Sequence, residues 1–400
     1  MTRRVFFELA TTGVCLIAGS MVLFRSELLV FYRKVKGRLI TNQFPRAVLQ
    51  HVAELLPDGE RVSVELALNS RCSSDYDGAS EVFHWGMFDT AARLSADQIH
   101  RIVNLAGSSL LSQAGNGINV ENDFLTFCVD VADLDGQWEV SMIESGMQQQ
   151  AVCLACAALG VGLMFHAQGP DGTKLSPRKS FTVKIQLGAM KPSYQGSFWS
   201  RSAPGSERPW LPGNLPDPAR DGQIPLVKAL EKVQCDSGAG TAVTAGNLSQ
   251  LLWAARGRTP HLYKSKPWGL TIPTWQGLQN LTGILVAAGG NIYKYVNWKN
   301  ARPTHRLECA AEVPALLRQL RDAFPPWKSF VVLSVNEPHA RALWEIGYQL
   351  LNIVVQASAL GIAYRTIVLR DQDRAAFAAI DPGKPVVMIG LKGLDSSFLA

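Results

Sequence analysis

The sequence lacks the short motifs that mark several large enzyme classes. It contains no HExxH metal motif, no Walker phosphate loop and no G-x-S-x-G nucleophile turn. Gly238-Ala239-Gly240 has neither the third glycine nor the preceding strand of a dinucleotide-binding fingerprint. None of the seven histidines lies at the spacing of a metal-binding pair. The sequence therefore gives no support to a zinc hydrolase, a nucleotide-binding enzyme of these types or a serine hydrolase.

Cysteine is sparse, with seven residues spread from Cys15 to Cys309. An odd number at such distances does not form a disulfide framework, so we predict mostly buried free thiols. Cys153 and Cys156 make a CxxC inside the apolar run AVCLACAAL, where residues i and i+3 share one helical face. A redox or metal role is the alternative, but no second Cys or His pair completes a four-ligand set.

Positive charge is in modest excess, and it is not clustered. The 39 Lys and Arg residues against 33 Asp and Glu give a formal charge of +6, yet they form no basic stripe with interleaved aromatics. We therefore expect no nucleic-acid partner. The chain is 400 residues long and 47% hydrophobic, which exceeds the size of one ordinary core and predicts two globular units.

The first 40 residues form a predicted targeting or membrane-anchor segment. Arg3 and Arg4, followed by Phe6, resemble the start of a twin-arginine export signal. Residues 5–24 are apolar apart from Glu8, and no small-x-small cleavage site ends the run, so we expect an uncleaved anchor. A buried N-terminal helix of the main fold is the alternative.

Two signals disagree on which side of the membrane the body lies. The twin-arginine start favours the periplasmic side. Five cations that follow the apolar run favour the cytoplasmic side by the positive-inside rule: Arg25, Arg33, Lys34, Lys36 and Arg38.

The chain also contains an internal repeat. Residues 144–160 align without gaps on residues 345–361 at an offset of 201, with six of seventeen positions identical. Both segments read as long buried helices that end in a glycine suited to a left-handed cap. LSADQIHRIVNLAG and AGNLSQLLWAARG repeat a second helix pattern, and FTVKIQLG and KPVVMIGLKG a strand pattern. The chance likeness of apolar helices is the alternative to two homologous halves.

Residues 192–225 separate the two halves. They contain seven prolines, which exclude regular secondary structure over most of the segment. Phe198, Trp199 and Trp210 make it too aromatic for a free tether, so we expect a strap that wraps along the fold. We therefore predict four segments: an anchor at 1–40, an N-terminal half at 41–191, a linker at 192–225 and a C-terminal half at 226–400.

The C-terminal half carries five elements in a fixed order. They are IPLVKALEK, NLSQLLWAARGR, LTIPTWQGLQN, the pair NIYKYV and THRLECA, and ALWEIGYQLLNIVVQASALGIAY followed by VVMIGLKG. In this order the half resembles the nitroreductase superfamily, and within it the peptide-azoline (thiazole/oxazole) dehydrogenase branch. The resemblance implies an α+β fold with a mixed, largely antiparallel sheet flanked by helices, and two fused halves that form an internal pseudo-dimer.

The resemblance also implies FMN at the interface of the two halves. One half holds the phosphate with an Arg-x-Ser-x-(Arg/Lys) element, and a Pro-Ser loop of the other half lies along the ring and ribityl chain. LNSRCSSDY keeps Arg71 and Ser73 but has Asp75 where the second cation belongs. In the C-terminal half residues 233–236 (VQCD) have lost the element. A surface turn rich in Ser and Asp is the alternative for Arg71 and Ser73.

The Pro-Ser loop survives in altered form in the C-terminal half, as Pro273, Thr274, Trp275 and Gln276. The resemblance therefore implies one composite site per chain, with the phosphate on Arg71 and Ser73 and the ring along the Pro273 loop. Lys191 lies where related proteins return a basic residue to the phosphate. Trp275 would stack on the flavin or fill its place.

We therefore predict an FMN-dependent oxidoreductase that takes electrons from NAD(P)H and acts on a small-molecule or peptide substrate. The chain would be a monomer that serves as its own pseudo-dimer. The competing hypothesis is a membrane-anchored pseudoenzyme that binds a flavin or a partner without catalysis, and a purely structural membrane-associated protein is a third reading.

Overall fold

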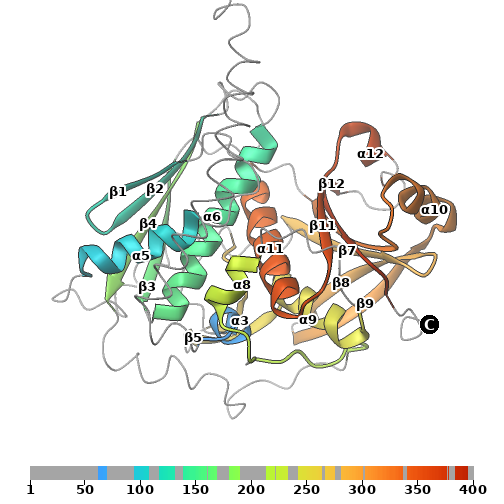
Figure 1. Cartoon of the computed structure of the whole chain (residues 1–400), viewed down its shortest axis with the longest axis horizontal. Helices are drawn as coiled ribbons and strands as arrows, with labels where there is room; N and C mark the ends of the chain where they lie inside the picture. Colours follow the sequence, from blue (N-terminus) through green and yellow to red (C-terminus); the bar gives the residue numbers. More distant parts are fainter. Residues whose placement is uncertain are drawn as a thin grey trace, which may run out of the picture.

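The computed structural model describes residues 62–69, 94–107, 117–130, 138–159, 161–168, 180–189, 213–220, 222–232, 242–263, 266–274, 281–300, 302–336, 340–375, 377 and 383–394. These residues form helices and antiparallel sheets, in agreement with the predicted α+β class (Figure 1). Among them no helix is long and apolar enough to cross a membrane. The predicted anchor at residues 5–24 lies outside the described ranges.

The first sheet belongs to the N-terminal half and has the strand order β1-β2-β4-β3. Its strands are β1 (Gly117–Glu121), β2 (Phe124–Asp130), β3 (Val161–Gln168) and β4 (Ser180–Ala189). All of its strand pairs are antiparallel. Three helices in the described residues accompany it: α3 (Val64–Asn69), α5 (Ala96–Gly107) and α6 (Trp138–Leu159). α5 begins with a capping box, in which Ser95 and Gln98 exchange side-chain to backbone hydrogen bonds.

The second sheet belongs to the C-terminal half and has the order β11-β12-β10-β7-β8-β9. Its strands are β7 (Thr282–Ala288), β8 (Asn291–Lys299), β9 (Arg302–Glu312), β10 (Ser329–Val335), β11 (Tyr364–Val368) and β12 (Lys384–Leu391). Its strand pairs are antiparallel too, and the parallel contact in the described residues is an isolated bridge between Val243 and Leu394. A separate hairpin joins β5 (Arg258–Tyr263) to β6 (Lys266–Leu270).

Within the described ranges five helices accompany the second sheet: α8 (Leu226–Lys232), α9 (Ala245–Arg256), α10 (Pro314–Ala323), α11 (Ala340–Ala359) and α12 (Asp371–Ala375). α9 begins where the Thr244 side chain accepts a hydrogen bond from the Asn247 amide. α11 ends as predicted, because Gly361 takes a left-handed φ of 66° while Ile362 N–H donates to the Ala357 carbonyl. Gly160, its predicted counterpart, lies outside the described residues.

The two sheets share one topology. α6 connects β2 to β3, and α11 connects β10 to β11. The strand order β1-β2-β4-β3 therefore repeats as β7-β10-β12-β11, with β8, β9 and α10 inserted after β7 in the C-terminal half.

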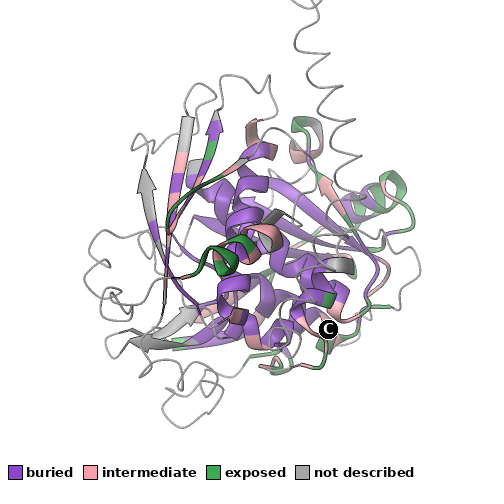
Figure 2. Ribbon diagram, turned by 60° about the vertical axis from the view of Figure 1, so that its left-hand side comes forward, coloured by how far each residue is buried: buried purple, intermediate pink, exposed green. Residues whose placement is uncertain are grey.

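α6 and α11 lie side by side at the centre of the molecule (Figure 1). Both are buried along most of their length, and one apolar cluster continues through both halves (Figure 2). The helices touch at Gly146 and Gly347, where a Cβ atom on Gly347 would overlap the Ile143 carbonyl and one on Gly146 the Trp344 carbonyl. Gly146 and Gly347, like Ile143 and Trp344, are counterparts at the 201-residue offset. The contact is therefore reciprocal, as in a two-fold interface.

The described part of the linker lies along the fold and has no helix or strand of its own before α8. Asn214 exchanges two hydrogen bonds with the backbone of Leu307 on β9, at 2.8 and 2.9 Å. The Gln250 side chain on α9 exchanges two more with the backbone of Ala219. Side chains thus replace the ladder that a proline-rich segment cannot form.

Candidate functional site

Two of the seven predicted site residues fall in the described part of the chain. Pro273 and Thr274 are buried in the loop that follows β6. Arg71, Ser73, Lys191, Trp275 and Gln276 lie outside the described residues. The predicted convergence of Arg71 and Ser73 on the Pro273 loop therefore stays a prediction.

The start of this loop is held by both central helices. Gln150 on α6 and Asn352 on α11 both donate to the Thr271 carbonyl, at 3.0 and 3.3 Å. Gln150 Nε2 also donates to Asn352 Oδ1 at 2.8 Å, and Asn352 donates to the Ala254 carbonyl at 2.9 Å. All of these side chains are buried. The loop that carries Pro273 is thus fixed where the two halves meet.

Three arginines gather beside this loop, and we call them the arginine cluster: Arg220 from the linker, Arg256 at the end of α9 and Arg258 at the start of β5. Burial raises the pKa of Tyr295 on β8, and the positive charges of all three arginines act in the opposite direction. Burial, and then the charge of Arg256, lowers the pKa of Arg258 to about 10. The cluster therefore concentrates positive charge next to the junction, with Arg256 and Arg258 buried and Arg220 half-buried.

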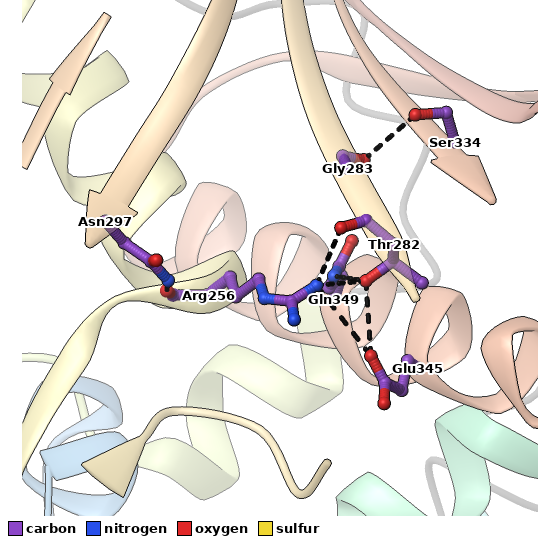
Figure 3. A network of polar contacts seen from close by, with 7 residues as sticks. All are labelled: Arg256, Thr282, Gly283, Asn297, Ser334, Glu345 and Gln349. Carbon is purple, nitrogen blue, oxygen red and sulfur yellow. Dashed lines mark hydrogen bonds and ion pairs between the residues drawn. The ribbon is translucent and has the colours of Figure 1, made fainter. Parts of the chain in front are cut away.

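Arg256 is fixed by a polar network of its own (Figure 3). Its guanidinium donates to the carbonyl and the hydroxyl of Thr282, and it lies 3.8 Å from the Glu345 carboxylate. The Thr282 hydroxyl donates to Glu345 at 3.2 Å and accepts from Gln349 at 2.7 Å. Asn297 donates to the Arg256 carbonyl at 2.6 Å. This network joins α9, β7, β8 and α11, so Arg256 has a structural role.

Arg258 and Arg220 each lie over an aromatic ring. The Arg258 guanidinium carbon is 4.4 Å from the centre of Trp298, and that of Arg220 is 5.1 Å from the centre of Trp253. Arg220 Nη1 donates to the Arg258 carbonyl at 2.8 Å and to Asn69 Oδ1 at 3.1 Å. Asn69 ends α3, two residues before Arg71. The last described residue before the predicted phosphate element therefore contacts the arginine cluster.

A second buried network extends from Tyr295. The Tyr295 hydroxyl lies 2.8 Å from His305 Nδ1, and His305 Nε2 lies 2.7 Å from the Ser249 hydroxyl, which donates to the Pro216 carbonyl at 2.5 Å. Because Ser249 uses its hydrogen on Pro216, His305 donates from Nε2 and accepts from Tyr295 at Nδ1. Burial first, and then Arg220, lowers the pKa of His305 to about 3. The neutral imidazole thus links the linker to the second sheet.

Acidification should weaken this network. The folded pKa of His305, about 3, lies below its unfolded value, so between the two values only the unfolded chain binds the proton. This contribution to stability is complete above about pH 6.5 and is lost as the pH falls toward 3. We expect it to lower the free energy of unfolding by about 2–3 kcal/mol between pH 7 and 4.5.

Urea unfolding at a series of pH values checks this expectation. The free energy of unfolding of the wild type should fall more steeply with decreasing pH than that of His305→Gln, and the difference is the contribution of His305. His100→Gln, on the exposed face of α5, should have the same pH dependence as the wild type. Parallel curves for the wild type and His305→Gln would contradict the assignment.

The sequence did not single out Arg220, Arg256, Arg258, His305 or Gln150 as site residues. The one local pattern that could have indicated part of the cluster is ARGR, which places Arg256 and Arg258 on either side of Gly257 at the end of a helix. None of the four described cysteines forms a disulfide, as predicted, but only Cys153 and Cys156 are buried, whereas Cys128 and Cys309 are exposed. No group of metal-ligating side chains occurs within the described ranges.

Comparisons with known proteins give limited similarity. No protein-family model and no curated protein matches the chain. A solved structure of a candidate nitroreductase from Ralstonia eutropha JMP134 is 19% identical, with a TM-score of 0.36, and the match covers 47% of this chain and 94% of that one. Another, from Anabaena variabilis ATCC 29413, is 11% identical with a TM-score of 0.46, and the match covers 68% and 69%.

Proposed function

We propose that this chain is an FMN-dependent oxidoreductase, in which two nitroreductase-like halves are fused into an internal pseudo-dimer. The observation that carries the proposal is the junction itself. There the loop that leads to Pro273 and Thr274 is held by Gln150 of one half and Asn352 of the other, beside the arginine cluster. The family resemblance of the sequence places a flavin between halves in the same way.

Two features of the fold support the fused pseudo-dimer. The strand order of the first sheet recurs in four strands of the second, with one long helix at the same point in each. The central helices touch reciprocally at Gly146 and Gly347. A closed two-fold interface makes such reciprocal contacts between equivalent residues.

The described residues fit the phosphate group of FMN. Arginine guanidinium groups are strong donors to phosphate oxygens. Asn69 is 1% exposed, and its Nδ2 has no hydrogen-bond partner among the described residues. A buried donor that could bind a phosphate oxygen therefore lies beside the arginine cluster. When bound, the flavin would supply the hydride chemistry. The protein would bind the phosphate electrostatically, position the ring through the Pro273 loop and limit the access of water there.

The absorbance spectrum after mild purification from membranes tests this proposal. We expect a yellow protein, or a colourless one that takes up added FMN at micromolar concentration. NAD(P)H oxidation should follow, and Arg71→Ala should abolish it. A protein that stays colourless in excess FMN would refute flavin binding.

A second candidate is a membrane-anchored pseudoenzyme that retains the fold as a binding module. It is favoured by Arg256, whose guanidinium is held by Thr282 and Glu345, and by Asp75 in the place of a cation. Tight flavin uptake without NAD(P)H oxidation would favour this candidate. In either case we propose attachment through residues 5–24 with the body on the periplasmic side, which accessibility labelling of intact cells can test.

A further inference from the structure

We infer that Arg220 and Asn69, backed by Arg258, form the phosphate-binding end of this site. The family element has a second cation where this chain has Asp75, and these side chains would take over the role of that cation. The inference rests on the proposed flavin function and assigns its phosphate recognition to residues outside the family element. The ligand is a flavin that carries a terminal phosphate monoester.

Asn69 has a side-chain donor that is not used within the described residues. Its Oδ1 accepts a hydrogen bond from Arg220, which fixes the direction of the amide, while Nδ2 is buried and has no partner among the described residues. A buried donor without an acceptor is unfavourable, because it has lost its hydrogen bonds to water and gained none in the protein. An anionic oxygen at this position would remove that cost.

The position of Arg220 also favours phosphate binding. This side chain is half-buried, whereas Arg258 is 2% exposed, so Arg220 lies on the solvent side of the cluster. It bridges α3 of the N-terminal half and β5 of the C-terminal half through Asn69 and the Arg258 carbonyl. The cation therefore contacts Asn69, which precedes Arg71 by two positions in the sequence.

The positive charges within the cluster repel one another. The charge of Arg256 acts against the charge of Arg258, and that of Arg220 acts against protonation of His305. A phosphate monoester carries up to two negative charges, so its binding would offset this repulsion in a medium that screens charges poorly. Riboflavin, which lacks the phosphate, would gain none of this stabilisation.

Binding of FMN and riboflavin to the colourless full-length protein, followed by the quenching of flavin fluorescence, separates the two contributions. We expect the wild type to prefer FMN. Arg220→Gln should weaken FMN binding about 10- to 100-fold, the loss of a charged hydrogen bond, and leave riboflavin binding within about threefold. Arg318→Gln, on the exposed face of α10, should change neither.

Asn69→Asp is the second variant, and it distinguishes a loss of phosphate binding from a loss of folding. The carboxylate keeps an acceptor for Arg220 but replaces the Nδ2 donor with a negative oxygen. We expect FMN binding to fall about 10-fold or more, with riboflavin binding and the thermal midpoint unchanged or higher.

The outcomes are distinguishable. If the wild type binds neither flavin, the proposed function fails and the inference fails with it. If the wild type binds both flavins equally, or if the two variants keep the preference for FMN or lose both flavins alike, the inference is overturned while flavin binding stands.

Discussion

Gly347→Ala should destabilise the protein by more than about 3 kcal/mol, because the new methyl group has no space at the crossing of α6 and α11. Its Cβ would overlap the Ile143 carbonyl and lie 2.8 Å from the Met147 nitrogen. Both are backbone atoms of a buried helix, so they cannot move aside as the end of a side chain does. The helices would have to separate, and the core that they share would lose contacts.

Gly246→Ala is the matched control, since this glycine also lies in a helix. The nearest atom to its Cβ would be the Thr244 hydroxyl oxygen at 3.9 Å. There the higher helix propensity of alanine should leave stability unchanged or raise it by up to about 1 kcal/mol. Chemical unfolding of the three proteins at one pH provides the comparison. A Gly347→Ala variant within about 0.5 kcal/mol of the wild type would show that the helices do not cross this closely.

Glu345→Gln should cost about 3–5 kcal/mol, because it leaves the buried charge of Arg256 without its counter-ion. The substitution preserves shape, and the new amide oxygen still accepts from Thr282. Burial lowers the pKa of Arg256, and Glu345 acts in the opposite direction, so the loss of the carboxylate removes what opposes the cost of burial. Replacement of both residues by methionine should recover much of the loss, since an apolar pair carries no desolvation penalty.

Glu308 provides the exposed comparison. Its ion pair with Lys299 is as close as 2.6 Å, but the two side chains are 37% and 44% exposed. Glu308→Gln should therefore cost less than about 1 kcal/mol. A double-mutant cycle on Arg256 and Glu345 measures the coupling directly. Equal costs for Glu345→Gln and Glu308→Gln would contradict the burial argument.

The sequence predicted helices α9 and α11 and the paired segments of β8 and β9, but it missed the β5–β6 hairpin. α9 and α11 have helical periodicity, and their ends carry the polar cap or the glycine that the structure uses. The β5–β6 hairpin was not predicted, because Pro260 and Pro267 lie within its strands and proline disfavours a central strand. A two-stranded sheet has only edges, and an edge strand tolerates a residue that lacks an N–H group.

The candidate site was harder to predict, because its residues come together only through the fold. Asn69, Arg220 and Arg258 come from α3, the linker and β5, and no local pattern connects them. Two of the predicted residues, Pro273 and Thr274, belong to a contiguous motif that the family resemblance supplied. The buried His305 carries no local sign of its partners, Ser249 and Tyr295.

The amide pair at the junction also bears on self-association. At the 201-residue offset the counterpart of Gln150 is Leu351, and that of Asn352 is Ala151. Two copies of the N-terminal half would therefore set Gln150 against alanine, and two copies of the C-terminal half would set Asn352 against leucine. Each homotypic pairing would leave a buried amide without its partner, which costs more than the matched pair. The amide pair thus selects the heterotypic union of the two halves over either alternative.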